Sequence, residues 1–160
     1  MAPSPREEIE FTHDDWTGVV ERAGAMAGSG KGWINLHPEV IDVDGLAEDG
    51  GGPRVGLGAM FWTRGPAVPM ATWVMATSKA ASTIGIEHGV RAKVLRRLRD
   101  QGIEPPPGAV MVQDNARRGL VLRLPDGAEP EVVLGWLMEA VDELCPLQLT
   151  GAWLAQLHPG

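Results

Sequence analysis

The sequence of 160 residues lacks several features that define common protein classes. It contains a single cysteine, Cys145, so it can form neither an internal disulfide bond nor a zinc site built from several cysteines. No apolar run approaches the roughly 18 residues of a membrane-spanning helix. The N-terminus, MAPSPREEIE, is acidic and has no apolar stretch of the kind found in secretory signals. These absences predict a cytoplasmic protein that does not contact a membrane.

Positive charge and aromatic residues are also scarce. The chain has 14 Lys and Arg against 21 Asp and Glu, a net charge of −7, and this disfavours nucleic-acid binding because phosphate contacts need a surplus of positive side chains. Tyrosine is absent and the second half has no phenylalanine, so the aromatic stacking residues of RNA-binding sheets are missing there. We therefore expect no nucleic-acid partner.

The chain has the length of one domain, and its hydrophobic periodicity predicts an α+β fold with a mainly antiparallel sheet. Residues 1–10 are rich in Pro, Ser and Glu and are predicted to be a disordered tail, leaving residues 11–160 as a single domain. Residues 12–77 are predicted as α-β-β-β. Their elements are a helix from the N-cap Thr12 to the glycines at 28–30 and strands at 33–43, 55–62 and 70–76.

Residues 82–157 are predicted as β-α-β-β-α-β, which is the split-βαβ or ferredoxin-like order. The expected elements are strands at 82–88, 109–113, 120–124 and 147–157, with helices at 90–101 and from Pro130 to Pro146. An alternative interpretation takes Ser82 to Gln101 as one continuous helix. The order then becomes α-β-β-β-α-β-β-α, which resembles the folds of secretion chaperones.

The split-βαβ order has a consequence for polar residues. The first two strands of this half run parallel with the third between them, so the ends of the first two meet the start of the third at one rim of the sheet. That rim gathers Glu87, His88, Gln113, Asp114, Arg117 and Arg118. His88, Gln113, Arg117 and Arg118 are the predicted binding residues for a small carboxylate or phosphate, because histidine titrates near neutral pH and arginine pairs with anions.

The same rim supports an alternative hypothesis, a small hydrolase or isomerase. Its acid and base would be His88 with Glu87 or Asp114. No nucleophile–base pair, metal cluster or cofactor fingerprint can be assembled from neighbouring residues, and this lowers the odds of an enzyme without removing them.

Other motifs in the chain fail on spacing or position. Gly28-Ser29-Gly30-Lys31 lacks the remaining positions of a phosphate-binding loop and ends a helix instead of beginning one. The acidic residues at 42–49 lack EF-hand spacing, the four histidines lack metal-ligand spacing, and Cys145 follows a helix C-terminus, which disfavours a thiolate. We expect no metal site and no cofactor.

The stretch from Val112 to Leu122, which contains Gln113-Asp114 and Arg117-Arg118-Gly119-Leu120, resembles uncharacterised proteins of GC-rich actinobacteria. That resemblance implies no activity. The Trp- and Met-rich strands of the first half are expected to form core, a pocket or a dimer interface. Together these features predict a homodimeric, non-catalytic binding or accessory module that contacts a protein partner or a small anionic ligand.

Overall fold

The structure is a computed structural model that describes residues 6–41 and 68–160. These residues form seven strands and three helices. In chain order they are β1 (Glu7–Thr12), α1 (Thr17–Ser29), β2 (Trp33–Ile41), β3 (Met70–Val74), β4 (Thr83–Glu87), α4 (Leu95–Asp100), β5 (Val110–Asn115), β6 (Gly119–Arg123), α5 (Pro130–Leu144) and β7 (Gln148–His158).

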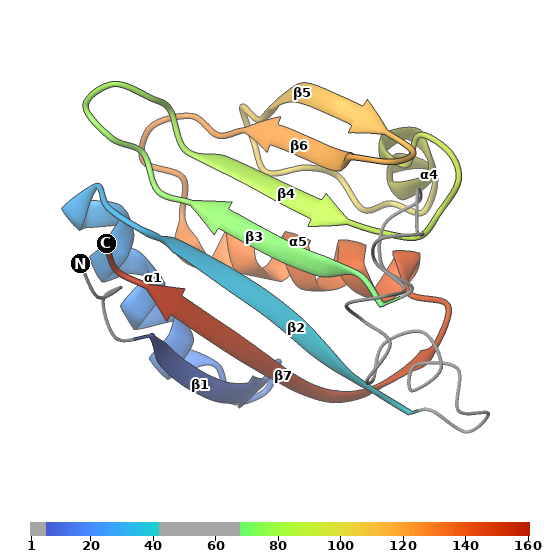
Figure 1. Cartoon of the computed structure of the whole chain (residues 1–160), viewed down its shortest axis with the longest axis horizontal. Helices are drawn as coiled ribbons and strands as arrows, with labels where there is room; N and C mark the ends of the chain where they lie inside the picture. Colours follow the sequence, from blue (N-terminus) through green and yellow to red (C-terminus); the bar gives the residue numbers. More distant parts are fainter. Residues whose placement is uncertain (1–5, 42–67) are drawn as a thin grey trace.

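The seven strands form one antiparallel sheet in the order β1-β7-β2-β3-β4-β6-β5 (Figure 1). Helices α1 and α5 lie behind this sheet in the view of Figure 1, and α4 lies beside the tip of the β5–β6 hairpin. Among the described residues no helix covers the opposite face. The α+β class and the antiparallel sheet are therefore confirmed. No helix within the described ranges is long and apolar enough to cross a membrane.

The core lies between the sheet and its helices because strand and helix periodicities place apolar residues on facing surfaces. Every second residue of the inner strands is buried, as Ile84 and Ile86 of β4 show. Helix α5 buries Val133, Leu137 and Val141, which recur every four residues along one side. Pro130 occupies the first turn of α5, where its missing N–H is harmless.

The second half has the predicted element order, from β4 through β7. The ferredoxin-like arrangement is nevertheless not confirmed, since it would place the last strand beside β4, whereas β7 pairs with β1 and β2. The elements from α1 to α5 also follow the alternative order α-β-β-β-α-β-β-α, but the continuous helix over 82–101 is wrong. Strand β4 occupies its first part, and α4 begins only at Leu95.

Two expectations for the first half need correction. Glu7–Thr12 is strand β1 and not the end of a disordered tail, because Ile9 and Phe11 alternate with glutamates and Phe11 is buried 6.4 Å from Trp153 between ring centroids. Helix α1 begins at Thr17, so Thr12 is not its N-cap. The hydroxyl of Thr12 instead accepts a hydrogen bond from the Asp15 N–H in the turn that precedes the helix.

Strand β2 lies inside the sheet between β7 and β3, although it contains Pro38 and proline is typical of edge strands. Pairing with β3 ends at Leu36, and the register with β7 shifts between Pro38 and Val40. Proline therefore sits where its missing N–H disturbs little. The acidic stretch at 42–49 and the strand expected at 55–62, which contains Met60 and Trp62, lie outside the described residues.

Candidate functional site

The predicted rim forms where β4, β5 and β6 end. Strands β4 and β5 each pair antiparallel with β6 and therefore run parallel to each other. Leu120 lies opposite both Ile86 and Asp114, so the ends of β4 and β5 meet the start of β6. A side chain at Gly119 would collide with the Ile86 carbonyl, and its φ of 84° also favours glycine, which lets the hairpin approach β4.

His88 lies at this rim but is only 1% exposed. Its Nδ1 accepts a hydrogen bond from the Val90 N–H at 3.2 Å, so the neutral ring carries its proton on Nε2. Nε2 has no hydrogen-bond partner among the described residues. Burial lowers the pKa of His88, and Arg97 adds to this, whereas the charge of Asp114 acts in the opposite direction. The contacts favour a neutral, buried imidazole.

The carboxylate of Asp114 holds the start of α4. Its Oδ1 accepts a hydrogen bond from the Val94 N–H at 2.9 Å, and its Oδ2 accepts one from the Leu95 N–H at 3.1 Å. These N–H groups belong to the first turn, which has no partners within the helix. Both carboxylate oxygens are thus engaged in local structure, and this explains why α4 begins five residues later than expected.

Gln113 and Asn115 hold the turn between β5 and β6. The Gln113 amide donates to the carbonyl of Arg118 at 3.1 Å. The Asn115 side-chain oxygen accepts hydrogen bonds from the N–H groups of Arg117 and Arg118 at 2.8 and 3.1 Å. This is an Asx-type turn that shapes the hairpin backbone. The side chains of Arg117 and Arg118 remain exposed.

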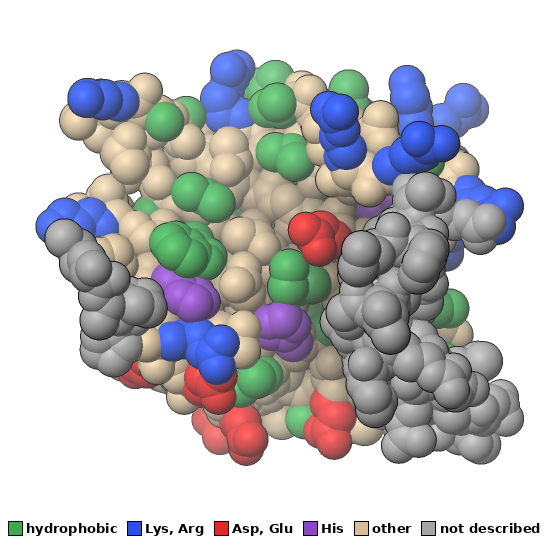
Figure 2. Space-filling view, in the orientation of Figure 1, with side chains coloured by type: hydrophobic (Ala, Val, Ile, Leu, Met, Phe, Trp, Pro, Cys, Tyr) green, Lys and Arg blue, Asp and Glu red, His purple; other side chains and the backbone are tan. Residues whose placement is uncertain are grey.

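The rim therefore offers positive charge but no acid–base pair among the residues that the structure describes. Glu87 is exposed on the face opposite to His88, since successive strand residues alternate, and no hydrogen bond joins His88 to a carboxylate in those ranges. Arg117 and Arg118 make no ion pair there either. Figure 2 shows Lys and Arg side chains gathered over α4, which contributes exposed Arg96 and follows exposed Arg91 and Lys93.

The glycine-rich segment after α1 and the single cysteine have structural roles. Gly30 ends α1 in the left-handed conformation with φ of 68°, so the segment from Gly28 to Lys31 is a helix stop. Burial raises the pKa of the Cys145 thiol, which disfavours a thiolate nucleophile. Within the described ranges no group of three or more His, Cys, Asp or Glu side chains is placed to hold a metal ion.

The outer strand β5 has a property that the sequence did not reveal. Val110, Met111 and Val112 are 48%, 51% and 59% exposed, and within the described ranges β5 pairs only with β6. The register shifts between Met111 and Gln113, so Val112 forms a β-bulge. The apolar run Val110–Val112 was visible in the sequence. Its exposure depends on β5 being last in the sheet, which residue spacing does not specify.

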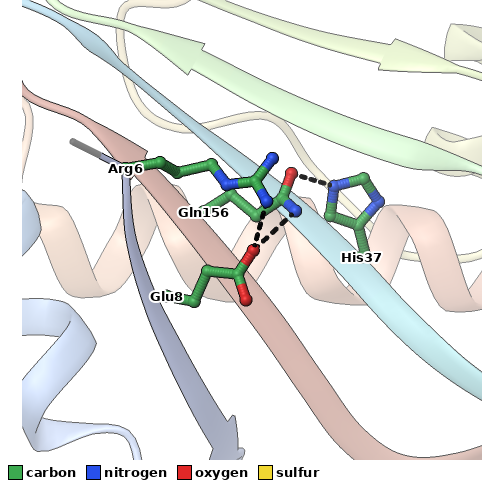
Figure 3. A network of polar contacts seen from close by, with 4 residues as sticks. All are labelled: Arg6, Glu8, His37 and Gln156. Carbon is green, nitrogen blue, oxygen red and sulfur yellow. Dashed lines mark hydrogen bonds and ion pairs between the residues drawn. The ribbon is translucent and has the colours of Figure 1, made fainter. Parts of the chain in front are cut away.

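The helix-free face of the sheet carries a polar network across β1, β7 and β2 (Figure 3). The Gln156 amide donates to Glu8 at 3.2 Å, and Arg6 pairs with Glu8 at 2.8 Å. Because a carboxylate only accepts, the Gln156 oxygen must face His37, whose Nε2 therefore donates over 3.0 Å. On the same strands, the ring of Trp33 in β2 stacks on that of His158 in β7, with 4.6 Å between ring centroids. These contacts tie β1, β7 and β2 together through polar side chains on this face of the sheet.

Comparison with protein-family models, with curated proteins and with solved structures finds no match for the chain. The resemblance to actinobacterial proteins therefore stays a prediction.

Proposed function

We propose that this protein is a non-catalytic binding module that acts through protein–protein contact, and that its contact surface is the apolar edge formed by Val110, Met111 and Val112. A second copy of the chain is the proposed partner. The observation that carries the proposal is the run of three neighbouring apolar side chains, each about half exposed, on a strand that has one neighbour among residues 6–41 and 68–160.

Several arguments support a second copy as the partner. An edge strand leaves unpaired backbone N–H and C=O groups, and monomeric proteins normally protect such strands with charge. The segment Val110–Gln113 has no charged residue. Around a two-fold axis the same surface meets itself, so an uncharged apolar edge packs without opposing like charges. Arg117 and Arg118 lie at the hairpin end of β5, away from Val110, so an antiparallel pairing separates the two copies of this arginine pair.

The test is the mass of the protein in solution. Light scattering at micromolar concentration should give about 34 kDa, twice the 17.1 kDa of one chain. Val112→Lys should give a monomer, because each copy would bury a charge at the contact. Val132→Lys is the matched control, since Val132 is 41% exposed on α5 and lies outside the proposed contact. A monomeric native protein overturns the proposal, and so does equal loss of the dimer in both variants.

A second candidate function is binding of a small anionic ligand at the hairpin tip. The exposed guanidinium groups of Arg117 and Arg118 favour it, since neither makes an ion pair in the described part of the chain. Citrate or inorganic phosphate should raise the melting temperature of the native protein. The double variant Arg117→Ala and Arg118→Ala should abolish that rise, and the control Arg123→Ala, an exposed arginine of β6, should keep it. An unchanged rise in the double variant rejects this site.

A further inference from the structure

Three neighbouring hollows lie along the outer side of α5. Their volumes are about 350, 400 and 270 Å³, and all three include Glu139 in their walls. The first hollow and the second also share His13, and the second and third share Asp142. The three hollows are therefore adjacent along α5, and we call them together the α5 groove. Its lining residues do not include Val110, Met111, Val112, Arg117 or Arg118.

The first hollow has a floor of glycine and walls of tryptophan. Gly135 lies one helical turn from both Glu131 and Glu139, so these residues share one side of α5. A Cβ atom at Gly135 would lie 3.7 Å from the end of the Trp16 ring, which shows that this ring reaches over the glycine. Trp136 completes the wall. It is 5% exposed, and its indole N–H has no hydrogen-bond partner among the described residues.

The α5 groove is acidic. Glu131, Glu139 and Asp142 are exposed and make no ion pair within residues 6–41 and 68–160. The other two carboxylates of the groove are partly neutralised, because Glu104 pairs with Arg99 at 3.5 Å and Glu143 pairs with Arg97 at 3.3 Å. A cation placed over the face of an indole ring and beside carboxylates is held by both. The net charge of −7 also attracts positive partners.

We propose that the α5 groove binds a basic, extended segment of a partner polypeptide, with one Arg or Lys side chain seated in the first hollow between Trp16, Glu131 and Glu139. The series of three hollows fits several residues of an extended chain better than a single small cation.

The probe is a synthetic peptide of alternating arginine and glycine, and its comparison is the same peptide with citrulline in place of arginine, which keeps the shape and removes the charge. Binding is followed by the indole N–H signals of the protein in NMR spectra, assigned by Trp→Phe variants. The arginine peptide should shift the Trp16 and Trp136 signals and leave the Trp33 signal, on the helix-free face, in place. Failure of the arginine peptide to bind, or equal binding of the citrulline peptide, overturns the proposal.

Two variants test whether the peptide binds in the first hollow or is attracted only by the net negative charge of the protein. The double variant Glu131→Gln and Glu139→Gln should weaken peptide binding by about tenfold. The control Glu87→Gln, an exposed glutamate of the opposite face, should leave it nearly unchanged. Gly135→Ala keeps every charge, fills the floor of the hollow at ordinary contact distance and should also weaken binding. Equal weakening by Glu87→Gln, or full affinity in Gly135→Ala, shows attraction to overall charge alone and rejects the seat.

Discussion

Among the described residues, the two edge strands of the sheet, β1 and β5, differ in the side chains that flank their unpaired backbone groups. Strand β1 carries Glu7 and Glu8, which pair with arginines at 2.7 and 2.8 Å, and it turns Phe11 into the core. Strand β5 instead exposes apolar side chains, and its first charged residue is Asp114. Charge on an edge strand prevents association with other strands. The comparison therefore supports the proposal that β5 is the edge that makes the contact, whereas β1 is protected by charge.

The bulge at Val112 refines this comparison. A bulge interrupts a hydrogen-bonded ladder and bends the strand, so a further strand could follow β5 for only a short distance. We therefore expect the side chains of Met111 and Val112 to contribute more to a dimer than backbone pairing does.

The largest expected difference between the edges is in the stability of the fold. Phe11→Ala should lower the free energy of unfolding by about 3 to 4 kcal/mol, because it removes a buried aromatic side chain. Met111→Ala, at a half-exposed position, should change it by less than about 0.5 kcal/mol. Urea denaturation measures both. The variants are made in the Val112→Lys background so that dimer dissociation does not contribute, and similar losses would show that β5 is not an exposed edge.

Loss of a polar contact near either edge should lower the free energy of unfolding by a smaller amount. Asp114→Ala removes both hydrogen bonds at the start of α4 and should cost about 1 to 2 kcal/mol. Glu7→Gln breaks an exposed ion pair with Arg22 and should cost only about 0.3 kcal/mol. Urea denaturation at low and high salt checks this prediction. Salt should remove the effect of Glu7→Gln and leave most of that of Asp114→Ala, since exposed pairs are screened.

Residue spacing predicted where the three strand ends meet, because the order of strands and helices depends on patterns between residues close in the sequence. The alternation of Ile84 and Ile86 marked β4. Gly102 follows the end of α4, where the Ile103 N–H donates to the Leu98 carbonyl at 2.9 Å. Those signals gave the order of elements and hence the meeting point of three strand ends.

What each rim residue does could not be predicted in the same way. Asp114 lies twenty residues from the N–H of Val94, so its capping role depends on tertiary structure. The position of β7 between β1 and β2 is also a long-range pairing, and it separates this sheet from the ferredoxin-like arrangement. Strand β1 was missed because three of its six residues are glutamates, which are typical of exposed tails.

A pH-dependent effect on stability is expected at His88, which lies in the segment between the end of β4 and the start of α4. Its pKa is lowered by burial in the folded state, whereas an unfolded chain binds the proton near pH 6.5. Above that pH His88 is neutral in both the folded and the unfolded state, so its titration does not lower the free energy of unfolding. As the pH falls below 6.5, the unfolded state gains a proton that the folded state does not, so stability declines by at most about 1.4 kcal/mol per pH unit. The decline ends at the lower folded pKa.

His88→Phe should remove this pH dependence while lowering stability at neutral pH, because the Val90 N–H loses its acceptor, at a cost of about 1 to 2 kcal/mol. The measurement is the free energy of unfolding between pH 7.5 and 5 for the native protein and the variant, taken as a difference so that carboxylate titration cancels. The control His13→Gln replaces an exposed histidine and should keep the native slope. If the His88→Phe slope equals the native one, the imidazole is protonated equally in both states. The end of β4 is then held by a solvated histidine, and the contrast between a buried polar anchor near β5 and exposed ion pairs at β1 is lost.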